Sequence, residues 1–578
     1  MRKLTLAIFL SLAARAAQPT ITATAKGPNQ INLTWPAAAN PGYGYLVEIQ
    51  SVTDTRYSAW TELQPIPVAS GYAGDPTGQH VYNPALNTLA TWVTEPQFTD
   101  PQDGTPAQFI ATGLLPATTY RFRVRTHTWA TFPAYSRYSD SVAATTAAYP
   151  QLYVSPTGND SNAGTKAAPF LTLAKAGAAL ACGQVLMVAG GDYLNDHLAL
   201  AQNCTPASKA VVLVNPGDTA TIAGPASSGP AIVLSGSNVV VDGLIDRTAA
   251  TDYQVLVAGS RNALFNLETA GSYGGVHLVH ADHALIYHSY LHDGGNPAVD
   301  NGGGGFVLAV EQSAENVIWS NHLTRGSHDV SLCKSTCTHS RWLNNVMDGG
   351  WGMGFEAIEN STGNLIEGNL IYHVQQLIGA TYKPSIEISS ASNTVRRNLI
   401  LGGASFAIEI SALYGGDTAR AVLVYNNTLA GNKSCLFESA NDGGGLGDSA
   451  YDGVVFANNI CSGFTGNATD IYRANVQSQI ANNAFFGTLK SVIWAHRLAG
   501  NYQYPRAVDD ADTVYAPPFS GNVTMPARFT ETGDYHLNPL SPLTGMAAAV
   551  ADPVWPVAPA TDLGAFGIGS IPVLLSKQ

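Results

Sequence analysis

A recurring asparagine is the feature that most constrains the fold of this chain. Short segments in which apolar and polar residues alternate are each followed by Asn and then by another apolar residue. The spacings between successive copies are 24, 24, 29, 29, 32 and 24 residues. Repeats of this length, with side chains of period two, predict a solenoid of short β-strands and exclude helical repeats. The repeated residues are Asn321, Asn345, Asn369, Asn398, Asn427, Asn459 and Asn483.

The predicted solenoid is a right-handed parallel β-helix that spans residues 149–570. Each coil would bury its alternate residues, and the repeated Asn would stack into a hydrogen-bonded ladder at a turn. Weaker copies of the repeat at 238–245 and 283–291 extend the coil toward the N-terminus. The fold class is therefore all-β.

Residues 18–148 follow a different pattern. The segments at 31–35, 45–50 and 119–128 are alternating strands without the repeated Asn. "INLTW" ends at Trp35, and "GLLPATTY" places Tyr120 after a Pro-containing corner. This region resembles a fibronectin type III β-sandwich, with Trp35 as its core tryptophan and Tyr120 as its corner tyrosine. Residues 65–103 depart from that pattern as an insertion. Such modules serve as spacers or binding modules, so the resemblance implies little about function.

The ends of the solenoid carry a second resemblance. "YVSPTGNDSNAGTKAAPFLTLAKAGAAL" (153–180) and "YHLNPLSPLTG" (535–545) are similar to the first and last segments of secreted β-helix proteins of the pectate-lyase type. The resemblance implies that "TLAKAGAAL" is a small helix that caps the open core. It covers some 400 residues and implies a fold more than a reaction, because such β-helices include lyases, glycosidases, epimerases and adhesins.

The N-terminus predicts export. Arg2 and Lys3 precede a short apolar run and the small-x-small site at 14–16, so residues 1–17 are expected to be a signal peptide. No later run reaches the roughly 18 apolar residues of a membrane helix. We therefore expect a secreted, extracellular or periplasmic, monomeric protein. The formal net charge of −13 argues against nucleic acid and anionic membranes as partners.

Six cysteines in an exported chain predict disulfides. A sequential pairing of Cys182 with Cys204, Cys333 with Cys337, and Cys435 with Cys461 is the expected one among fifteen possibilities. Their spacing lacks the C-x-x-C motif of structural zinc sites.

An acidic column is the main candidate site. The tetrapeptide "IEIS" occurs at 386–389 and again 22 residues later. With the isoleucines inward, Glu387 and Glu409 point outward on one face. In the preceding coil, "GFEAI" adds Glu356 to this column. Adjacent parallel strands lie ~4.8 Å apart, so the three carboxylates would be close neighbours.

One coil earlier, "HDVSLCK" (328–334) is predicted to continue the same face. Val330 and Leu332 would point inward, and Asp329 and Ser331 outward. Stacked like charges destabilise a sheet by up to about 1 kcal/mol per pair, so such a column needs a cation or a shared proton. The alternative is a polar surface of solvated glutamates.

Hard oxygen ligands of this kind suit Ca²⁺, which is the expected cofactor. The predicted metal ligands are Glu356, Glu387, Glu409, Asp329 and Asp348. Lys383 lies at the start of the Glu387 strand and is the predicted base, since a nearby cation would favour its neutral form. Aromatic residues near this face, Trp351, Tyr372 and Tyr382, are the predicted platforms for sugar rings.

Two further resemblances support chemistry on this face. "MDGGW" (347–351) followed by Lys383 is similar to the calcium turn and lysine base of calcium-dependent pectate lyases, although only Asp348 of the paired aspartates is present. "HDVSLCKS" resembles the carboxylate-then-Lys-Ser run of alginate- and chondroitin-cleaving β-helix lyases. His328 and Asp329 stand there in place of two glutamates, and the resemblance implies Lys334 as a second base candidate.

The predicted function is lysis of an acidic, uronate-containing extracellular or cell-wall polysaccharide by β-elimination. The catalytic candidates are Lys383, Glu356, Glu387, His328 and Lys334. Two alternatives remain: a β-helix glycoside hydrolase with a carboxylate pair, and a non-catalytic glycan-binding protein or adhesin. Removal of the acidic column would abolish turnover in an enzyme and leave binding intact in an adhesin.

Overall fold

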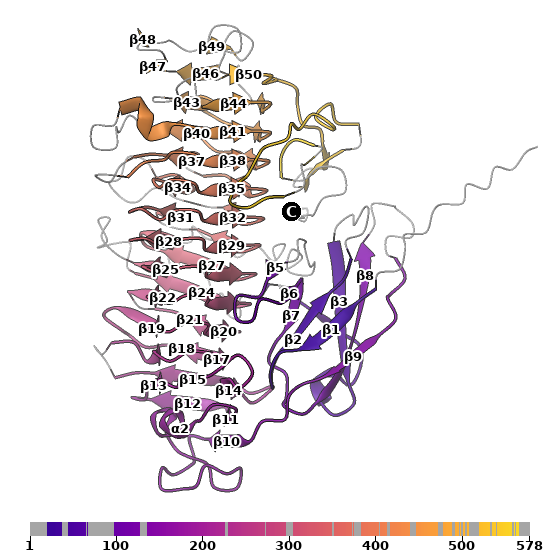
Figure 1. The fold of residues 1–578 in the computed structure, drawn as a ribbon, viewed down its shortest axis with the longest axis vertical. Coiled ribbons are helices and arrows are strands. Elements are labelled where there is room, and N and C mark those ends of the chain that lie inside the picture. The colour runs from indigo at the N-terminus through magenta and orange to yellow at the C-terminus, as the bar shows by residue number, and fades with distance from the viewer. Residues whose placement is uncertain are drawn as a thin grey trace, which may run out of the picture.

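The fold is known from a computed structural model of the whole chain (Figure 1). The structure describes residues 20–36, 44–64, 66–67, 98–127, 136–225, 229–271, 273–295, 305–349, 352–372, 374, 383–403, 405–412, 417–439, 447–471, 478–487, 492–495, 497–498, 501–502, 506–507, 519–531, 534–538, 540–557, 560 and 562–565. The predicted signal peptide and most of the predicted 65–103 insertion lie outside these residues.

The N-terminal region is a β-sandwich of two antiparallel sheets, with strand orders β1-β2-β7 and β4-β3-β8-β9. Alternate residues of both sheets meet in a core that contains Trp35 and Tyr120. The Tyr120 hydroxyl accepts a hydrogen bond from the Leu115 amide (2.9 Å) and donates one to Asp54 (2.7 Å). The fibronectin type III likeness remains a prediction. The elements are β1 (Thr22–Ala25), β2 (Ile31–Thr34), β3 (Gly44–Ser51), η1 (Thr55–Tyr57), β4 (Thr61–Leu63), β5 (Phe98–Thr99), β6 (Pro106–Ala107), β7 (Phe109–Ala111), β8 (Thr119–His127) and β9 (Val142–Thr145).

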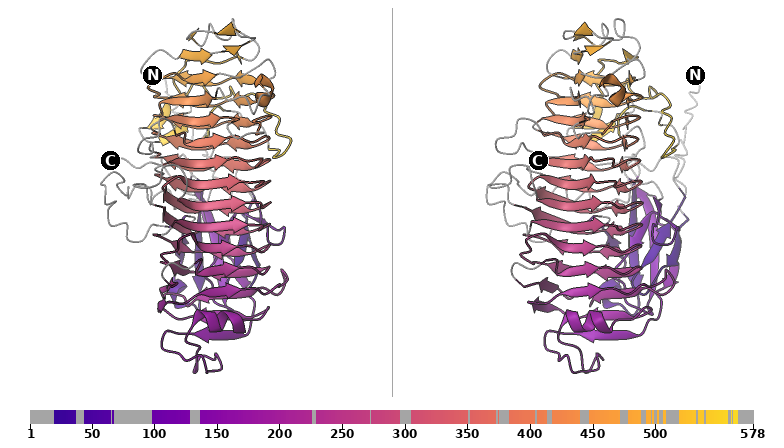
Figure 2. Two further views of the ribbon diagram at one scale, coloured as in Figure 1. Left: turned by 90° about the vertical axis from the view of Figure 1, so that its left-hand side faces the viewer. Right: turned by 60° about the vertical axis from the view of Figure 1, so that its left-hand side comes forward.

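The rest of the chain winds through three long sheets in turn, which confirms the predicted right-handed parallel β-helix. Figure 2 shows the coils stacked along the long axis of the molecule. We name the sheets by their order within a coil. The first sheet contains β10 (Gln151–Val154), β11 (Val185–Val188), β14 (Ala210–Val214), β17 (Val239–Asp242), β20 (Ala263–Phe265), β23 (Leu285–Tyr287), β26 (Val317–Trp319), β29 (Arg341–Leu343), β32 (Leu365–Glu367), β35 (Thr394–Arg396), β38 (Leu423–Tyr425), β41 (Val455–Ala457), β44 (Gln479–Ala481) and β50 (Phe519–Ser520).

The second sheet contains β12 (Gly191–Leu194), β15 (Ala220–Ala223), β18 (Leu244–Asp246), β21 (Glu268–Thr269), β24 (Tyr290–Gly294), β27 (His322–Gly326), β30 (Val346–Asp348), β33 (Leu370–Tyr372), β36 (Leu399–Leu401), β39 (Thr428–Ala430), β42 (Ile460–Ser462) and β45 (Ala484–Phe486). The third sheet contains β13 (Leu198–Leu200), β16 (Ile232–Leu234), β19 (Tyr253–Val257), β22 (Gly274–Val279), β25 (Phe306–Glu311), β28 (Asp329–Lys334), β31 (Met353–Ala357), β34 (Ile386–Ile388), β37 (Phe406–Ile410), β40 (Ser434–Glu438), β43 (Thr469–Ile471), β46 (Val492–Ala495) and the antiparallel β49 (Arg506–Ala507).

The remaining elements lie at the ends of the solenoid or between its strands. The predicted capping helix is present as α2 (Leu173–Ala179), beside the first coils (Figure 1). No described helix is long and apolar enough to cross a membrane. The other elements are η2 (Gly447–Tyr451), β47 (Arg497–Leu498), β48 (Asn501–Tyr502), β51 (Phe529–Glu531) and β52 (Asp534–Leu537).

The predicted asparagine ladder is confirmed at the turn between the first and second sheets. The Asn321 amide N–H donates to Oδ1 of Asn345 (2.9 Å), and Asn345 donates in the same way to Asn369. The ladder continues through every predicted Asn and ends at Asn522, which the sequence pattern had missed. Each buried side chain thus satisfies backbone groups of the preceding coil and fixes the register between neighbouring coils.

Two of the three predicted disulfides are present, Cys182–Cys204 and Cys333–Cys337. The third prediction was wrong, because Cys435 and Cys461 are both free and buried. They point into the core from the third and second sheets, and the thiol of Cys435 hydrogen-bonds that of Cys461. Burial, together with this contact, raises the pKa of the Cys461 thiol.

The sandwich packs against the outer face of the first sheet (Figure 1). Ala107 and Ile110 join an apolar cluster with residues of β11, β14, β17 and β20. At the centre of the contact, buried Asp242 accepts hydrogen bonds from the Asn29 amide (2.7 Å) and the Gly113 backbone (2.8 Å). The two regions are therefore joined by apolar burial and by a buried polar contact, not only by their linker.

Candidate functional site

Three glutamates form a continuous column on the outer face of the third sheet. Glu356 in β31 is in register with Glu387 in β34, and Glu387 is in register with Glu409 in β37. The flanking residues Phe355 and Ala357 lie in the solenoid core, so Glu356 points away from it. The predicted alignment of the two "IEIS" segments is confirmed, and adjacent members of the column are separated by one strand spacing of ~4.8 Å.

The column is largely shielded from water. Glu356 is 2% exposed and Glu387 is 5% exposed, whereas Glu409 is half-buried. Burial raises the pKa of Glu356 well above its ordinary value, and the charges of Asp329 and Glu387 add to the effect. Burial also raises the pKa of Glu387, and burial together with the Glu387 charge raises the pKa of Glu409 to about 8. All three carboxyls are therefore shifted toward the protonated form relative to ordinary surface glutamates.

Two serines from adjacent coils hold the central glutamate. The hydroxyls of Ser389 and Ser411 donate hydrogen bonds of 3.1 and 3.0 Å to the same carboxylate oxygen of Glu387. These bonds oppose the effect of burial by favouring the ionised form, so they lower the pKa of Glu387. Ser389 and Ser411 are the last residues of the two "IEIS" repeats, and they fix the orientation of Glu387.

Lys383 lies beside this column, as the sequence predicted. Its positive charge lowers the pKa of Glu356, Glu387 and Glu409, so it lies within electrostatic range of all three carboxyls. The side chain is partly exposed. A cation at the edge of a buried acidic column can exchange protons with both the column and a bound molecule.

His328 and Asp329 are placed beside the first glutamate of the column. The Nδ1 atom of His328 lies 2.9 Å from Oδ2 of Asp329, and the imidazole packs against the Phe306 ring with centroids 5.4 Å apart. Potential metal-binding atoms of His328, Asp329 and Glu356 all lie within 4.8 Å of one another. The structure thus brings together four of the five catalytic candidates: Lys383, Glu356, Glu387 and His328.

The predicted register of the 328–334 segment was partly wrong. Leu332, not Ser331, is in register with Glu356, and it joins an apolar cluster outside the core. Ser331 faces inward and accepts a hydrogen bond from the buried Trp342 indole (2.9 Å). Val330 also faces the core, so two consecutive residues point inward at the start of this strand. Strict alternation begins only at Ser331. Val307 and Leu308 in β25 show the same step, since both lie in the core.

Lys334 belongs to a separate polar cluster around Glu311. Its Nζ lies 3.2 Å from Glu311, whose carboxylate also lies 3.5 Å from His277. Glu311 and Lys334 are in register on adjacent strands, at the end of β28 that is distant from Asp329. The structure therefore does not bring Lys334 into the glutamate column.

The remaining predicted residues lie away from the column or outside the described residues. Asp348 is on the second sheet, in register with Tyr372. Tyr372 is 5% exposed and packs against Leu370 and Leu399, which leaves it little surface for a sugar ring. Trp351 and Tyr382 are not among the described residues. The roles of these residues stay predictions.

An aromatic pair beyond Glu409 was missed by the sequence analysis. Phe437 in β40 is in register with Glu409, and its ring stacks on Phe406 with centroids 4.2 Å apart and planes at 8°. Lys433 Nζ lies 5.9 Å from the Phe406 ring centroid. The signal was available, because "CLFE" continues the in–out pattern of the two preceding coils. Half-buried Phe437 extends the column with a surface on which an apolar sugar face can pack.

Fold and site together define a parallel β-helix with a buried acidic column on the third sheet. Comparison with solved structures finds a pectate lyase, Pel9A (15% identity, TM-score 0.43, 72% of this chain and 96% of that one). It also finds an exopolygalacturonase from Yersinia enterocolitica (12%, 0.39, 88% and 98%) and an alginate lyase from a Paenibacillus species (14%, 0.34, 46% and 89%). No protein-family model and no curated protein matches the sequence. These similarities are too distant to assign a reaction.

Proposed function

We propose that this protein is a secreted enzyme that cleaves an acidic, uronate-containing polysaccharide by β-elimination. The observation that carries the proposal is the in-register column of Glu356, Glu387 and Glu409, whose pKa values are all raised and which lies beside Lys383. Solvated surface acids would be ionised, whereas acids with raised pKa values next to a lysine are suited to proton transfer near neutral pH.

β-Elimination transfers one proton from the sugar and one to the leaving group. A base removes the proton from C5 of the uronate, the C4–C5 double bond forms, and the C4–O bond breaks. The departing oxygen then takes a proton from an acid. Lys383 is the proposed base. Glu409 is the proposed acid, because its pKa of about 8 keeps it protonated at neutral pH.

Removal of the C5 proton also requires that the negative charge of the uronate be neutralised. The fit of this face to a cation rests on fully buried Asp329, whose Oδ1 has no N–H or hydroxyl donor within the described structure. His328, Asp329 and Glu356 would hold the ion. A bound divalent ion would offset the uronate charge. The half-buried ring of Phe437 is the proposed contact for the neighbouring sugar.

A glycoside hydrolase is the second candidate, and one observation favours it. Glu387 and Glu409 lie on adjacent strands ~4.8 Å apart, close to the roughly 5 Å separation of the two carboxyl groups in retaining glycosidases. Protonated Glu409 would then be the general acid and Glu387 the nucleophile. A hydrolase releases reducing ends without forming a double bond, so the products separate the two reactions.

The test is to incubate the purified protein with pectate, alginate and glycosaminoglycans and to follow the ultraviolet absorbance of the unsaturated uronate. Absorbance should rise with at least one substrate, and Glu387→Gln should lower the rate by about 100-fold or more. Glu315→Gln is the matched control, because Glu315 is 60% exposed and pairs with His283 at a turn before the first sheet. Its activity should equal that of the wild type.

The other outcomes each assign a different function. Reducing ends without absorbance would replace the lyase by the hydrolase. Retention on a polysaccharide without turnover, unchanged in Glu387→Gln, would identify a glycan-binding protein. Absorbance that is unaffected by Glu387→Gln would place the catalytic site elsewhere on the solenoid.

A further inference from the structure

The group formed by His328, Asp329 and Glu356 differs from a site made of oxygen ligands alone. His328 and Asp329 end the turn that enters β28, and Glu356 comes from the next coil. The three side chains are nearly or fully buried, and one potential ligand atom of each lies within 4.8 Å of the other two. The donors are thus one imidazole nitrogen and two carboxylate oxygens, contributed by two adjacent coils.

Asp329 provides independent evidence that a ligand belongs here. Its side chain is completely buried, and Oδ2 faces Nδ1 of His328 at 2.9 Å. Oδ1 has no N–H or hydroxyl donor within the described structure, and the Glu356 carboxyl can hydrogen-bond Asp329 only by way of a shared proton. An unpaired oxygen on a buried carboxylate is costly, and nearly all such atoms in native proteins are satisfied by a donor, a water or an ion. A second carboxyl, that of Glu356, adjoins this one.

The donor set distinguishes between cations. Ca²⁺ takes six to eight oxygen ligands in flexible arrangements, and imidazole is not among its preferred donors. Imidazole together with carboxylates suits first-row transition ions and zinc, and three protein ligands with an open position are typical of catalytic zinc. Ca²⁺ was expected from the sequence because only carboxylates were counted as ligands on this face. His328 was not included among them.

We infer that His328, Asp329 and Glu356 bind a divalent ion of the zinc class, not Ca²⁺. The inference deepens the proposed function, because it names the cation that would meet the uronate carboxylate beside Glu387 and Lys383. The binding itself does not require that the protein be a lyase. Glu387 and Glu409 are then proton-transfer groups, and they are not metal ligands.

The experiment measures metal binding directly on the full-length protein after dialysis against chelator and then against chelator-free buffer. Titration calorimetry with Zn²⁺ and with Ca²⁺ should give one Zn²⁺ site, with Ca²⁺ at least about 100-fold weaker. Co²⁺ should give visible absorption bands that Zn²⁺ removes by competition. His328→Ala and Glu356→Gln should each weaken Zn²⁺ binding at least about 10-fold, as loss of a ligand requires.

His277→Ala is the matched control. His277 lies on the same outer face, in register with Ala309 and three coils before Glu356, and its ring nitrogen lies 3.5 Å from Glu311. This variant should bind Zn²⁺ as the wild type does. Thermal unfolding of every metal-free variant should stay within a few degrees of the wild type, so that loss of binding reports loss of a ligand. Glu356→Gln preserves size and shape, which guards against a folding defect in the alanine variant.

Two results would overturn the inference. In the first, Ca²⁺ binds as tightly as Zn²⁺ and His328→Ala changes neither affinity, so the site uses oxygen ligands alone. In the second, the wild type binds no Zn²⁺, so Asp329 and Glu356 share a proton in place of a metal. Failure of the proposed function is recognised separately. If Zn²⁺ binds through these residues but no polysaccharide gives an unsaturated product, only the lyase is refuted. If product still forms in chelator, only the part of the ion in the reaction is refuted, and the binding measurements decide the metal site.

Discussion

Glu387 and Glu409 lie in register on adjacent strands of the third sheet, with their side chains on the same outer face. Burial, together with the charge of Glu387, raises the pKa of Glu409 to about 8, against an ordinary value of 4.5. Folding therefore favours the protonated form of Glu409. The folded protein holds a proton between about pH 4.5 and pH 8 that the unfolded chain releases, so stability falls as the pH rises through this window.

Replacement of Glu409 by glutamine should remove this dependence on pH. The amide imitates the protonated carboxyl and cannot ionise, so Glu409→Gln should lose less stability than the wild type between pH 5 and pH 9. Thermal unfolding midpoints across this range test the prediction. The wild type should still lose some stability through Glu356 and Glu387, whose pKa values are raised in the same direction. Parallel curves for the two proteins would show that Glu409 is ionised like a surface acid.

The asparagine ladder should be a main determinant of stability in the central coils. Buried Asn398 donates hydrogen bonds to the Ile366 carbonyl and to Asn427, and its oxygen accepts two from Asn369. Asn398→Ala leaves these groups unpaired in the interior, at a cost of about 1–3 kcal/mol for each buried group left unsatisfied. Urea unfolding should show a loss of about 2–4 kcal/mol. The same substitution at half-exposed Asn467 should change stability by less than about 0.5 kcal/mol.

Much of this architecture could be predicted from the sequence, because a solenoid repeats its constraints. From Asn321 to Asn522 each coil places an Asn at the same turn and apolar residues at the same inward positions, so the ladder and the Glu387–Glu409 pairing follow from spacing alone. Capping helix α2 was predicted for a different reason: its segment resembles the first segment of secreted β-helix proteins. The errors fall where a coil departs from strict alternation, as at Ser331 and Leu332.

Contacts between distant segments leave no periodic signal. Glu311 pairs with Lys334 and so keeps this lysine from the column, but nothing in the "HDVSLCK" segment indicates its partner. The docking of the sandwich is similar, because Asn29 and Asp242 are 213 residues apart. The sequence shows His328 next to Asp329. Their approach to Glu356 depends on the turn geometry at the start of β28, which the sequence does not show.

Asp242 should couple the sandwich to the solenoid. It accepts hydrogen bonds from Asn29, Gly113 and Asn266, and an amide at this position would leave at least one of these donors unpaired. Asp242→Asn should therefore destabilise the protein by about 1–3 kcal/mol. Urea unfolding at pH 7 measures the loss, with exposed Asp192→Asn as the matched control.

The pH dependence of the same variant provides a second check. Burial raises the pKa of Asp242 to about 6 from an ordinary value of 3.8, so the folded protein retains a proton that the unfolded chain releases. The stability that this proton contributes is lost as the pH rises from about 4 to about 6. Asp242→Asn cannot show this loss, and its deficit relative to the wild type should be smaller at pH 7 than at pH 4. A deficit that grows with pH would mean that the carboxylate is the form favoured by folding.

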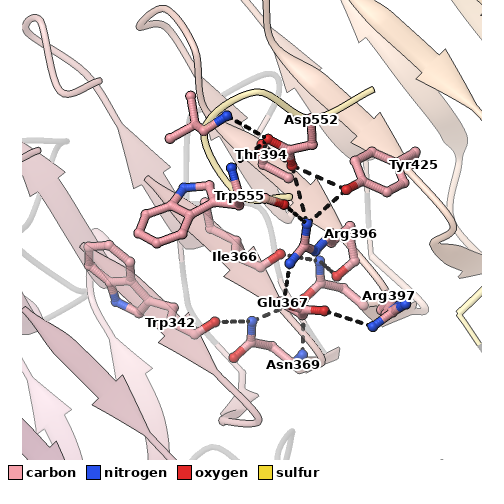
Figure 3. A network of polar contacts seen from close by, with 12 residues as sticks. Trp342, Ile366, Glu367, Asn369, Thr394, Arg396, Arg397, Tyr425, Asp552 and Trp555 are labelled. Carbon is pink, nitrogen blue, oxygen red and sulfur yellow. Dashed lines mark hydrogen bonds and ion pairs between the residues drawn. The ribbon is translucent and has the colours of Figure 1, made fainter. Parts of the chain in front are cut away.

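A buried arginine holds the C-terminal segment against the first sheet (Figure 3). Arg396 donates to Glu367 (2.9 Å) in the preceding coil, and to Asp552 (3.2 Å) and the Trp555 carbonyl (2.6 Å) in the C-terminal segment. Its side chain is 5% exposed, and the carboxylates of Glu367 and Asp552 are equally shielded. Removal of one partner from a buried ion pair costs about 3–5 kcal/mol, because the other charges stay buried without compensation.

Arg396→Met should therefore release the segment while the coils stay intact. The methionine fills most of the volume but leaves Asp552 without its cation and Glu367 with Arg397 alone. The least costly relief is for residues 540–557 to leave the surface and hydrate Asp552. Limited proteolysis should then cut within this segment at least about 10-fold faster than in the wild type, since local opening follows its own free energy. Arg420→Met, at an exposed turn, should leave the cutting rate unchanged. Equal cutting of Arg396→Met and the wild type would show that the apolar contacts of Trp555 and Val550 hold the segment without the arginine.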